Sequence, residues 1–186
     1  MLILASGSPR RKELLQSMGV TFQVVLPQVE ELNYLDDPQK LVETNAKLKT
    51  GWVAQRNPEN WVLGSDTTVA LGEEILNKPA DLAEARAMLS RMSGRTHCVY
   101  TAVCLSNHSL QIEEVITVTS HVRFKSFDDD LISRYFKLVN PLDKAGAYGI
   151  QEGKELIIDC WDGSCSNIMG LPVDEVRGLL GKYTLL

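Results

Sequence analysis

The chain has 186 residues, of which 44% are hydrophobic, and its 24 acidic and 19 basic residues give a formal net charge of −5. This length and apolar content are enough to bury a stable core, which excludes a disordered or fibrous protein. They predict a single domain over residues 1–186, or two small lobes that share a core.

The charge pattern excludes two classes of partner. The chain has no basic tail and no block of like charge, so we expect no binding to nucleic acid or to a membrane surface. No apolar run approaches the ~20 residues of a membrane span, and residues 1–6 are too short and uncharged for a signal peptide. We therefore expect a cytoplasmic protein, in which a local cluster of Lys and Arg could still bind a small anion.

Short strands alternate with helices in the first half of the sequence. Ser8 followed by Pro9 is typical of the first turn of a helix, which Gly19 ends. Asp37 followed by Pro38 repeats this signal. The elements expected here are strands over residues 2–5, 22–26 and 61–71, a helix after Ser8, and a helix over about 37–55 with Leu41, Leu48 and Trp52 facing inward.

Longer antiparallel strands are expected in the second half. Asp81 and Glu84 form a capping-box-like pair before a helix that ends near Met92. The other expected elements are strands over 99–105, 112–124, 148–150 and 156–161, a hairpin turn at 106–109, and helices over 128–138 and from Pro172. Early alternation followed by a meander favours an α/β domain with a mixed β-sheet.

The segment Ser6-Gly7-Ser8-Pro9-Arg10-Arg11 gathers groups that bind phosphate. Two hydroxyls, a glycine and the free N–H groups of a helix N-terminus lie beside two guanidinium groups, which makes it a candidate anion cradle. The alternative is a capped helix start with solvated arginines. Neither a Walker A nor a GxGxxG pattern occurs, so the common P-loop and dinucleotide fingerprints do not apply.

Asp66 lies within an apolar strand, between Leu63 and Val69. An unpaired buried carboxylate is costly, so it needs a metal, a cation or several hydrogen-bond donors. We interpret it as an acid that faces a cleft. The alternative is a hydrogen-bonded Asp at a β-bulge.

Two lysines are candidates for the same cleft. Lys49 lies on the helix before the Asp66 strand, and Lys78 follows a short strand, although either could be a surface lysine. Glu30 and Glu31, taken alone, are typical of a solvated loop. The three histidines lack metal-ligand spacing and no GxSxG motif occurs, which argues against a zinc site and a serine hydrolase.

Residues 143–151 place small side chains around a charged pair and end at Gln151. Small residues permit close approach of a planar ligand, and a glutamine amide can read a base edge with one donor and one acceptor. A tight loop that enters a strand explains the segment equally well.

Taken together, these segments resemble the Maf-like nucleoside triphosphate pyrophosphatases, in order and over nearly the whole chain. The matching segments are residues 5–11, 64–67, 78–79, 93–94 with 96–97, 143–151 and 170–172. The resemblance implies an α/β fold, similar to that of inosine triphosphatases, with a mixed sheet flanked by helices and an active cleft between two lobes. It also implies a homodimer.

The implied reaction is hydrolysis between the α and β phosphates of a nucleoside triphosphate, with a divalent cation, Mg²⁺ or Mn²⁺. By resemblance, Asp66 is the catalytic acid, as proton acceptor or metal ligand, and Glu31 is its acidic partner and the second metal ligand. Lys49 and Lys78 are the cations that meet the triphosphate. Around the phosphates lie Ser6, Ser8 and Arg11.

The base preference implied by the resemblance depends on three positions. Family members that prefer 7-methyl-GTP tend to have an aromatic residue, a Gln and an acid where this chain has Arg10, Thr67 and Gln151. The chain is therefore similar to the dTTP/UTP type, whose pyrimidine edge a glutamine amide can satisfy. Modified pyrimidine nucleotides are further candidate substrates.

Two alternatives remain open. One is a pyrophosphatase that prefers 7-methyl-GTP. The other is a nucleotide-sensing interaction protein that affects cell division, as the family's association with septum formation suggests. The intact set of Glu31, Lys49, Asp66 and Lys78 favours the enzyme.

Overall fold

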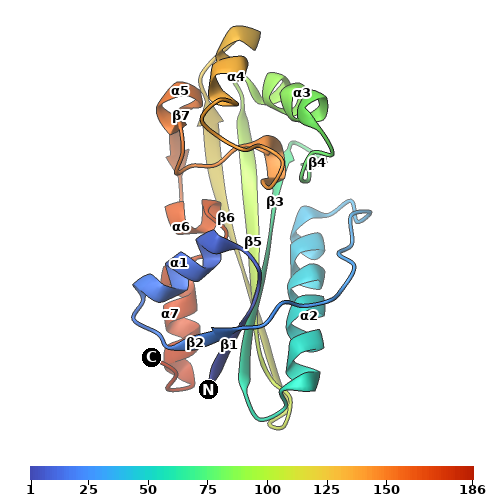
Figure 1. Cartoon of the computed structure of the whole chain (residues 1–186), viewed down its shortest axis with the longest axis vertical. Helices are drawn as coiled ribbons and strands as arrows, with labels where there is room; N and C mark the ends of the chain where they lie inside the picture. The colour runs from blue at the N-terminus through green and yellow to red at the C-terminus, as the bar shows by residue number, and fades with distance from the viewer.

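One seven-stranded sheet runs the length of the molecule (Figure 1), and a computed structural model describes it over all residues from Met1 to Leu186. The elements follow in the order β1 (Leu2–Ala5), α1 (Pro9–Ser17), β2 (Phe22–Val24), α2 (Pro38–Arg56), β3 (Trp61–Leu71), β4 (Glu74–Leu76), α3 (Leu82–Met92), β5 (Thr96–Asn107), β6 (Ile112–Phe124), α4 (Asp129–Tyr135), the 3₁₀ turn η1 (Ala145–Ala147), α5 (Lys154–Ile157), β7 (Ile158–Asp162), α6 (Cys165–Ile168) and α7 (Val173–Lys182).

The sheet mixes parallel and antiparallel pairing. Its order is β2-β1-β3-β5-β6-β7, with β4 paired to β3. β1 is parallel to both β2 and β3, whereas every other pair is antiparallel. The expected mixed sheet flanked by helices is confirmed.

Three long strands, β3, β5 and β6, pass through both halves of the molecule (Figure 1). We call the half with β1, β2, α1, α2 and α7 the lower lobe, and the half with β4, α3, α4, η1, α5 and β7 the upper lobe. None of the helices combines the length and the apolar character that a membrane crossing needs.

The lower lobe buries both faces of its sheet, and β1 shows why. Alternate side chains of a strand point to opposite faces. Leu2 and Leu4 pack in a cluster with residues of α1 and α7, whereas Ile3 and Ala5 pack with Val53 and Ala54 of α2. The two helical layers therefore enclose β1, whose four residues are all buried, as expected for a strand covered on both faces.

The upper lobe has a separate core of 18 buried residues. The ends of the long strands contribute Val69 and Phe124, and the helices contribute Leu89 of α3 and Tyr135 of α4. Two cores on one sheet leave a polar region between them, where the strands pass from one lobe to the other.

Three expectations from the sequence were wrong. Residues 156 and 157 belong to α5, so the strand expected over 156–161 begins only at Ile158. Residues 148–150 form no strand, because Gly146 and Ala147 have positive φ values of 67° and 63° and turn the chain through η1. Leu48 does not face inward: it is 39% exposed, and the inward stripe of α2 contains Asn45 and Lys49 instead. Both polar residues are buried because this part of α2 faces the region between the two cores.

Candidate active site

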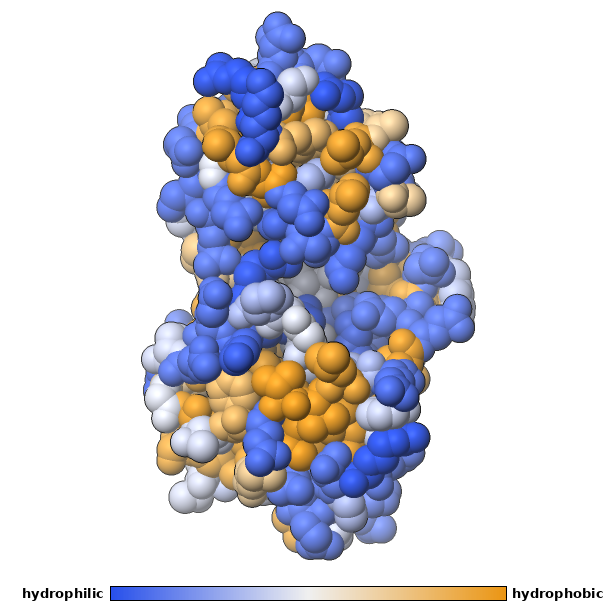
Figure 2. All heavy atoms as spheres, in the orientation of Figure 1, coloured by the Kyte–Doolittle hydropathy of each residue, from blue (hydrophilic) through white to orange (hydrophobic).

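A cavity of about 660 Å³ lies between the lobes, where Figure 2 shows a hollow surrounded by hydrophilic residues. The lower lobe contributes the loop before α1 and one face of α2, and the upper lobe contributes residues 143–151. The cavity is lined by all ten residues singled out from the sequence: Ser6, Ser8, Arg10, Arg11, Glu31, Lys49, Asp66, Thr67, Lys78 and Gln151. Their catalytic and binding roles stay predictions.

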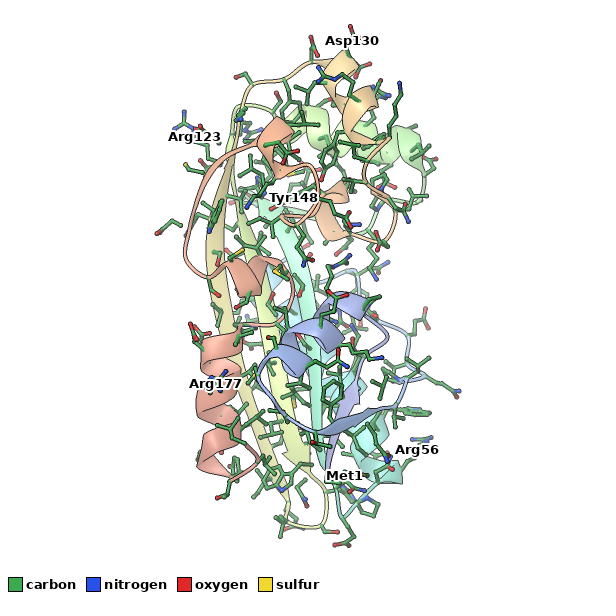
Figure 3. The ribbon with its side chains drawn as sticks, turned by 60° about the vertical axis from the view of Figure 1, so that its left-hand side comes forward. Met1, Arg56, Arg123, Asp130, Tyr148 and Arg177 are labelled. Atoms are coloured by element: carbon green, nitrogen blue, oxygen red, sulfur yellow. The ribbon has the colours of Figure 1, made fainter.

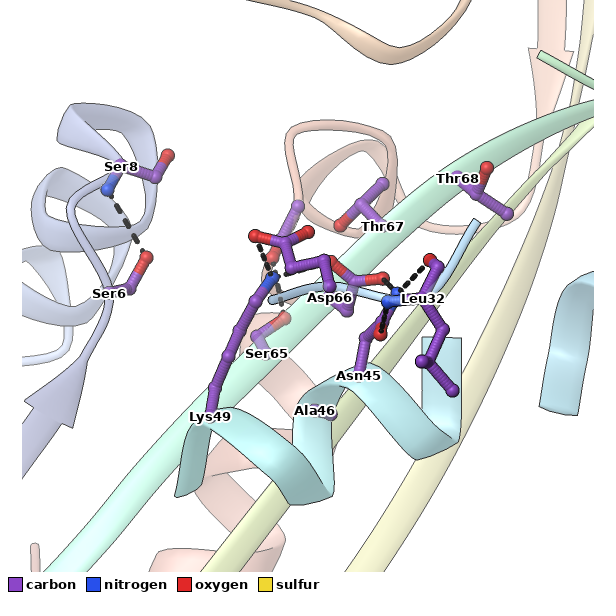
Figure 4. Close-up of polar contacts among 12 residues, drawn as sticks. Ser6, Ser8, Leu32, Asn45, Ala46, Lys49, Ser65, Asp66, Thr67 and Thr68 are labelled. Atoms are coloured by element: carbon purple, nitrogen blue, oxygen red, sulfur yellow. Dashed lines mark hydrogen bonds and ion pairs between the residues drawn. The ribbon is translucent and has the colours of Figure 1, made fainter. Parts of the chain in front are cut away.

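Lys49 lies between two carboxylates at the lower wall of this cavity (Figure 4). Its Nζ is 2.7 Å from Oδ1 of Asp66 and 3.0 Å from Oε1 of Glu31. The side chains of Lys49 and Asp66 are only 8% and 10% exposed, whereas that of Glu31 is 48% exposed. The buried Asp66 is therefore paired with a cation, and Glu31 keeps one side open to the cavity.

The pKa of Glu31 is lowered from its ordinary value. Burial acts to raise this pKa, but the positive charges of Lys49, Lys78 and Arg11 together outweigh it. Glu31 is therefore an ionised carboxylate at neutral pH.

Arg11 connects three segments of the lower wall without pairing to an acid. Its guanidinium donates to the carbonyl oxygen of Gly170 (2.9 Å), to Oγ1 of Thr67 (3.0 Å) and to Oγ of Ser6 (3.5 Å). Burial lowers the pKa of Arg11, while the nearby charges of Asp66 and Glu31 act to raise it. Because its partners are neutral, the charge of Arg11 is available to an anionic ligand.

Three further candidates, Arg10, Ser8 and Lys78, differ from Arg11 in the partners that they have. Arg10 forms an ion pair with Asp143 across the cavity (3.3 Å), so this arginine already has an acidic partner. The hydroxyl of Ser8 accepts from the backbone N–H of Arg11 and caps α1. Lys78 is exposed and has no ion pair or hydrogen bond within the protein, so it is a free cation at the cavity.

Tyr148 of the upper wall lies above α1 in Figure 3 and lines the cavity together with the ion-paired Asp143 and Lys144. Its hydroxyl is 2.8 Å from Nε2 of His97. Gln151 is exposed at the same wall, and its amide makes no hydrogen bond within the protein. The sequence motifs contained His97 and Tyr148 but gave no reason to join them, because 51 positions separate the two residues.

Asn45 is a polar lining residue that sequence reasoning missed. It is 3% exposed and its Nδ2 donates to Oδ2 of Asp66 at 3.2 Å. Its spacing of four residues from Lys49 puts both side chains on one face of α2, and this spacing was the signal that could have revealed it.

Three carboxylates line the cavity, of which Asp66 and Glu31 lie together around Lys49, whereas Asp143 pairs with Arg10 and Lys144. The structure brings together no group of three or more His, Cys, Asp or Glu side chains, so a cage made by the protein alone is absent. Mg²⁺ is commonly held by one or two carboxylates together with substrate phosphates. Asp66 and Glu31 fit that arrangement, in which a triphosphate would supply the other oxygen ligands.

The family model for Maf-like proteins matches residues 1–183 of the chain. The chain belongs to this family. The resemblance inferred from the motifs is thus confirmed. Five of the six matching segments contribute residues to the cavity lining, and residues 93–97 do not.

Relatives of this Maf-like chain include two proteins named dTTP/UTP pyrophosphatase. The protein from Myxococcus xanthus is 44% identical over 186 residues, which cover 100% of this chain and 93% of the relative. The protein from Thermotoga maritima is 39% identical over 177 residues, which cover 94% of this chain and 85% of the relative.

Proposed function

We propose that this Maf-like protein hydrolyses dTTP and UTP between the α and β phosphates, giving the monophosphate and pyrophosphate. The observation that carries the proposal is the pair of carboxylates, Asp66 and Glu31, on either side of Lys49 at the wall of the interlobe cavity. The names of the Myxococcus and Thermotoga relatives support the choice of substrates.

The triphosphate binds along the lower wall. Arg11 and Lys78 supply positive charge that no carboxylate of the protein pairs directly, and Ser6 and Ser8 supply hydroxyls beside the start of α1. The N-terminus of a helix adds free N–H groups that favour an anion. Phosphoryl transfer depends mostly on such positioning and charge stabilisation, so no nucleophilic Ser or Cys is needed.

The carboxylates accept the proton of the attacking water. Lys49 holds Asp66 and Glu31 in place, and Glu31 keeps its second oxygen free toward the cavity. Held by these two carboxylates, a divalent cation would share the charge of the triphosphate. In the absence of strong nucleophiles, a water oriented by carboxylates is the simplest attacking group.

The base lies against the upper wall. Gln151 presents a free amide that can both donate to and accept from a pyrimidine edge. We also propose that the protein is a cytoplasmic homodimer, as the family resemblance implies, which sedimentation of the purified protein and cell fractionation would test.

The test is an assay of the purified protein with Mg²⁺ and a panel of dTTP, UTP, CTP, GTP and 7-methyl-GTP. We expect pyrophosphate release to be fastest with dTTP and UTP, and excess EDTA to abolish it. Orthophosphate as the first product would contradict the proposed bond cleavage. Nucleotide binding without turnover would favour a sensing protein, and preference for 7-methyl-GTP would overturn the substrate assignment alone.

A further inference from the structure

Asn45 is a buried polar residue to which the proposed reaction assigns no role. It lies one helical turn before Lys49 on α2, so both side chains point toward β3. A buried primary amide has two N–H donors and a carbonyl acceptor that all need partners. Its partners therefore indicate what it does.

The amide of Asn45 holds one residue of a loop and one catalytic candidate at the same time (Figure 4). Its Oδ1 accepts from the backbone N–H of Leu32 at 2.8 Å, and its Nδ2 donates to the carbonyl oxygen of Leu32 at 3.0 Å. The same Nδ2 donates to Oδ2 of Asp66 at 3.2 Å. Every hydrogen-bonding group of the side chain is thus used.

Leu32 directly follows Glu31 in a segment whose backbone forms no hydrogen bonds other than those of Leu32 to Asn45. We call residues 25–37, between β2 and α2, the Glu31 loop. Between residues 26 and 36, no backbone group forms a hydrogen bond with another backbone group. The only hydrogen bonds of the backbone there are the two between Leu32 and the side chain of Asn45. Beyond these, the ion pair of Glu31 with Lys49 is the polar contact that holds the loop at the cavity.

We infer that Asn45 is a positioning residue that fixes the Glu31 loop against Asp66 and so sets how the two carboxylates lie around Lys49. Asp66 comes from a strand in the core and cannot shift easily. Glu31 comes from a loop that would otherwise depend on the ion pair alone. The consequence for turnover rests on the proposed function, whereas the attachment of the loop does not.

The chemistry of an amide is required at this position, because residues of similar size lack part of its pairing. A leucine would fill the space but would leave both backbone groups of Leu32, which are partly buried, without a partner. An aspartate could accept from Leu32 but would lose both donations and would place a second carboxylate beside Asp66.

The experiment uses the full chain with three substitutions. Asn45→Leu removes all of the hydrogen bonds, and Asn45→Asp removes the donated ones. Asn57→Ala is the matched control, since Asn57 follows the same helix and donates to the carbonyl oxygen of Val53 (2.9 Å) outside the cavity. For each variant we would measure amide hydrogen exchange at Leu32, thermal unfolding, and kcat and KM for UTP with Mg²⁺.

For Asn45→Leu we expect exchange at Leu32 to rise at least about tenfold while the protein stays folded, because its N–H loses its acceptor. We expect kcat to fall about 30- to 100-fold with KM changed less than about threefold, the effect of misplacing a reacting group by about 1 Å. Asn45→Asp should lower kcat to a similar extent with a smaller rise in exchange. Asn57→Ala should leave exchange and kcat unchanged.

Two results would overturn the inference. One is unchanged exchange at Leu32 in Asn45→Leu, and the other is wild-type kcat in whichever Asn45 variant folds. If the wild-type protein releases no pyrophosphate from any nucleotide, the proposed function fails. The exchange measurement then still decides whether Asn45 holds the loop.

Discussion

Lys49 in the lower lobe and His97 in the upper lobe are both buried, at 6% and 1% exposure, yet their surroundings differ completely. Lys49 has two carboxylates within 3.0 Å. His97 has the hydroxyl of Tyr148 on one ring nitrogen, and Nδ1, its other ring nitrogen, has no partner. The comparison shows that two similarly buried basic side chains can have opposite surroundings, carboxylates for Lys49 and a neutral hydroxyl for His97. His97 itself does not line the cavity but contacts Tyr148, which does.

Aromatic rings enclose His97. The centroid of its ring is 4.6 Å from that of Phe124 and 5.2 Å from that of Tyr148, both in edge-on geometry. Burial lowers the pKa of His97 to about 4 and raises that of Tyr148 well above its ordinary value. Both side chains are therefore neutral at pH 7, so the part of the upper wall that Tyr148 forms is uncharged, although the ion-paired Asp143 and Lys144 line the same wall.

The largest expected effect removes charge from the lower wall. Asp66→Asn keeps the shape of the side chain but can neither accept a proton nor carry charge, so we expect kcat to fall about 10²- to 10⁴-fold. Lys49 retains Glu31 as a partner, so the variant should remain folded. Kinetics and thermal unfolding check this together: near-normal kcat with a sharp loss of stability would mean that Asp66 is only a structural acid.

The stability of the protein should depend on pH through His97 in the upper lobe. The unfolded chain protonates His97 below about pH 6.5, the ordinary value, but the folded chain does so only near pH 4. Stability is therefore unaffected by this group above pH 6.5 and falls as the pH drops toward 4, by up to about 3 kcal/mol.

Unfolding of the wild type, His97→Gln and His121→Gln between pH 4.5 and 7.5 isolates this contribution. His97→Gln should show a shallower acid dependence than the wild type, whereas the exposed His121 is a control that should show none of this change. Equal slopes for His97→Gln and the wild type would mean that His97 binds its proton normally in the folded protein.

A negative charge at position 151 of the upper wall should alter which nucleotide base the protein prefers. Gln151→Glu replaces a donor by a carboxylate, and losing one hydrogen bond of about 1 to 3 kcal/mol should lower dTTP and UTP turnover about 10- to 100-fold. Competition among dTTP, UTP, CTP, GTP and 7-methyl-GTP measures it. If this substitution left the turnover of dTTP and UTP unchanged, Gln151 would take no part in base recognition.

The smallest effect is expected for Tyr148→Phe. It removes one neutral hydrogen bond to His97 and keeps the aromatic ring, so the free energy of unfolding should fall by about 1 kcal/mol. Because no charge is involved, kcat should stay close to that of the wild type. Denaturant unfolding and steady-state kinetics test the pair of outcomes, and a large loss of kcat would place the Tyr148 hydroxyl in the reaction.

Signals that are local in sequence predicted much of the fold. The caps at Ser8, Asp37 and Asp81 start helices where expected, and the strand over residues 61–71 was predicted with its observed bounds. The inward face of α2 was predicted only in part from hydrophobic spacing, because that face also buries polar side chains toward the cavity. Leu41 is buried and Trp52 packs against the core as expected, whereas Leu48 is exposed.

The candidate site was likewise predicted only in part from the sequence. Short motifs gave ten residues that line one cavity, because each motif contains its own charged or hydroxyl group. Asn45 carries no charge and belongs to no motif. Its importance comes from a contact with Leu32, 13 positions away, on a loop whose path no local pattern specifies.

The long strands shared by the two lobes have a mechanical consequence. The β3–β5 ladder is continuous from Trp61 opposite Asn107 to Ala70 opposite Cys98, and Asp66 pairs with Ala102 in its middle. Rotating one lobe against the other would bend or twist this ladder along its whole length, which opposes a free hinge between the lobes. We therefore expect the span between the two walls of the cavity to change little when a ligand binds.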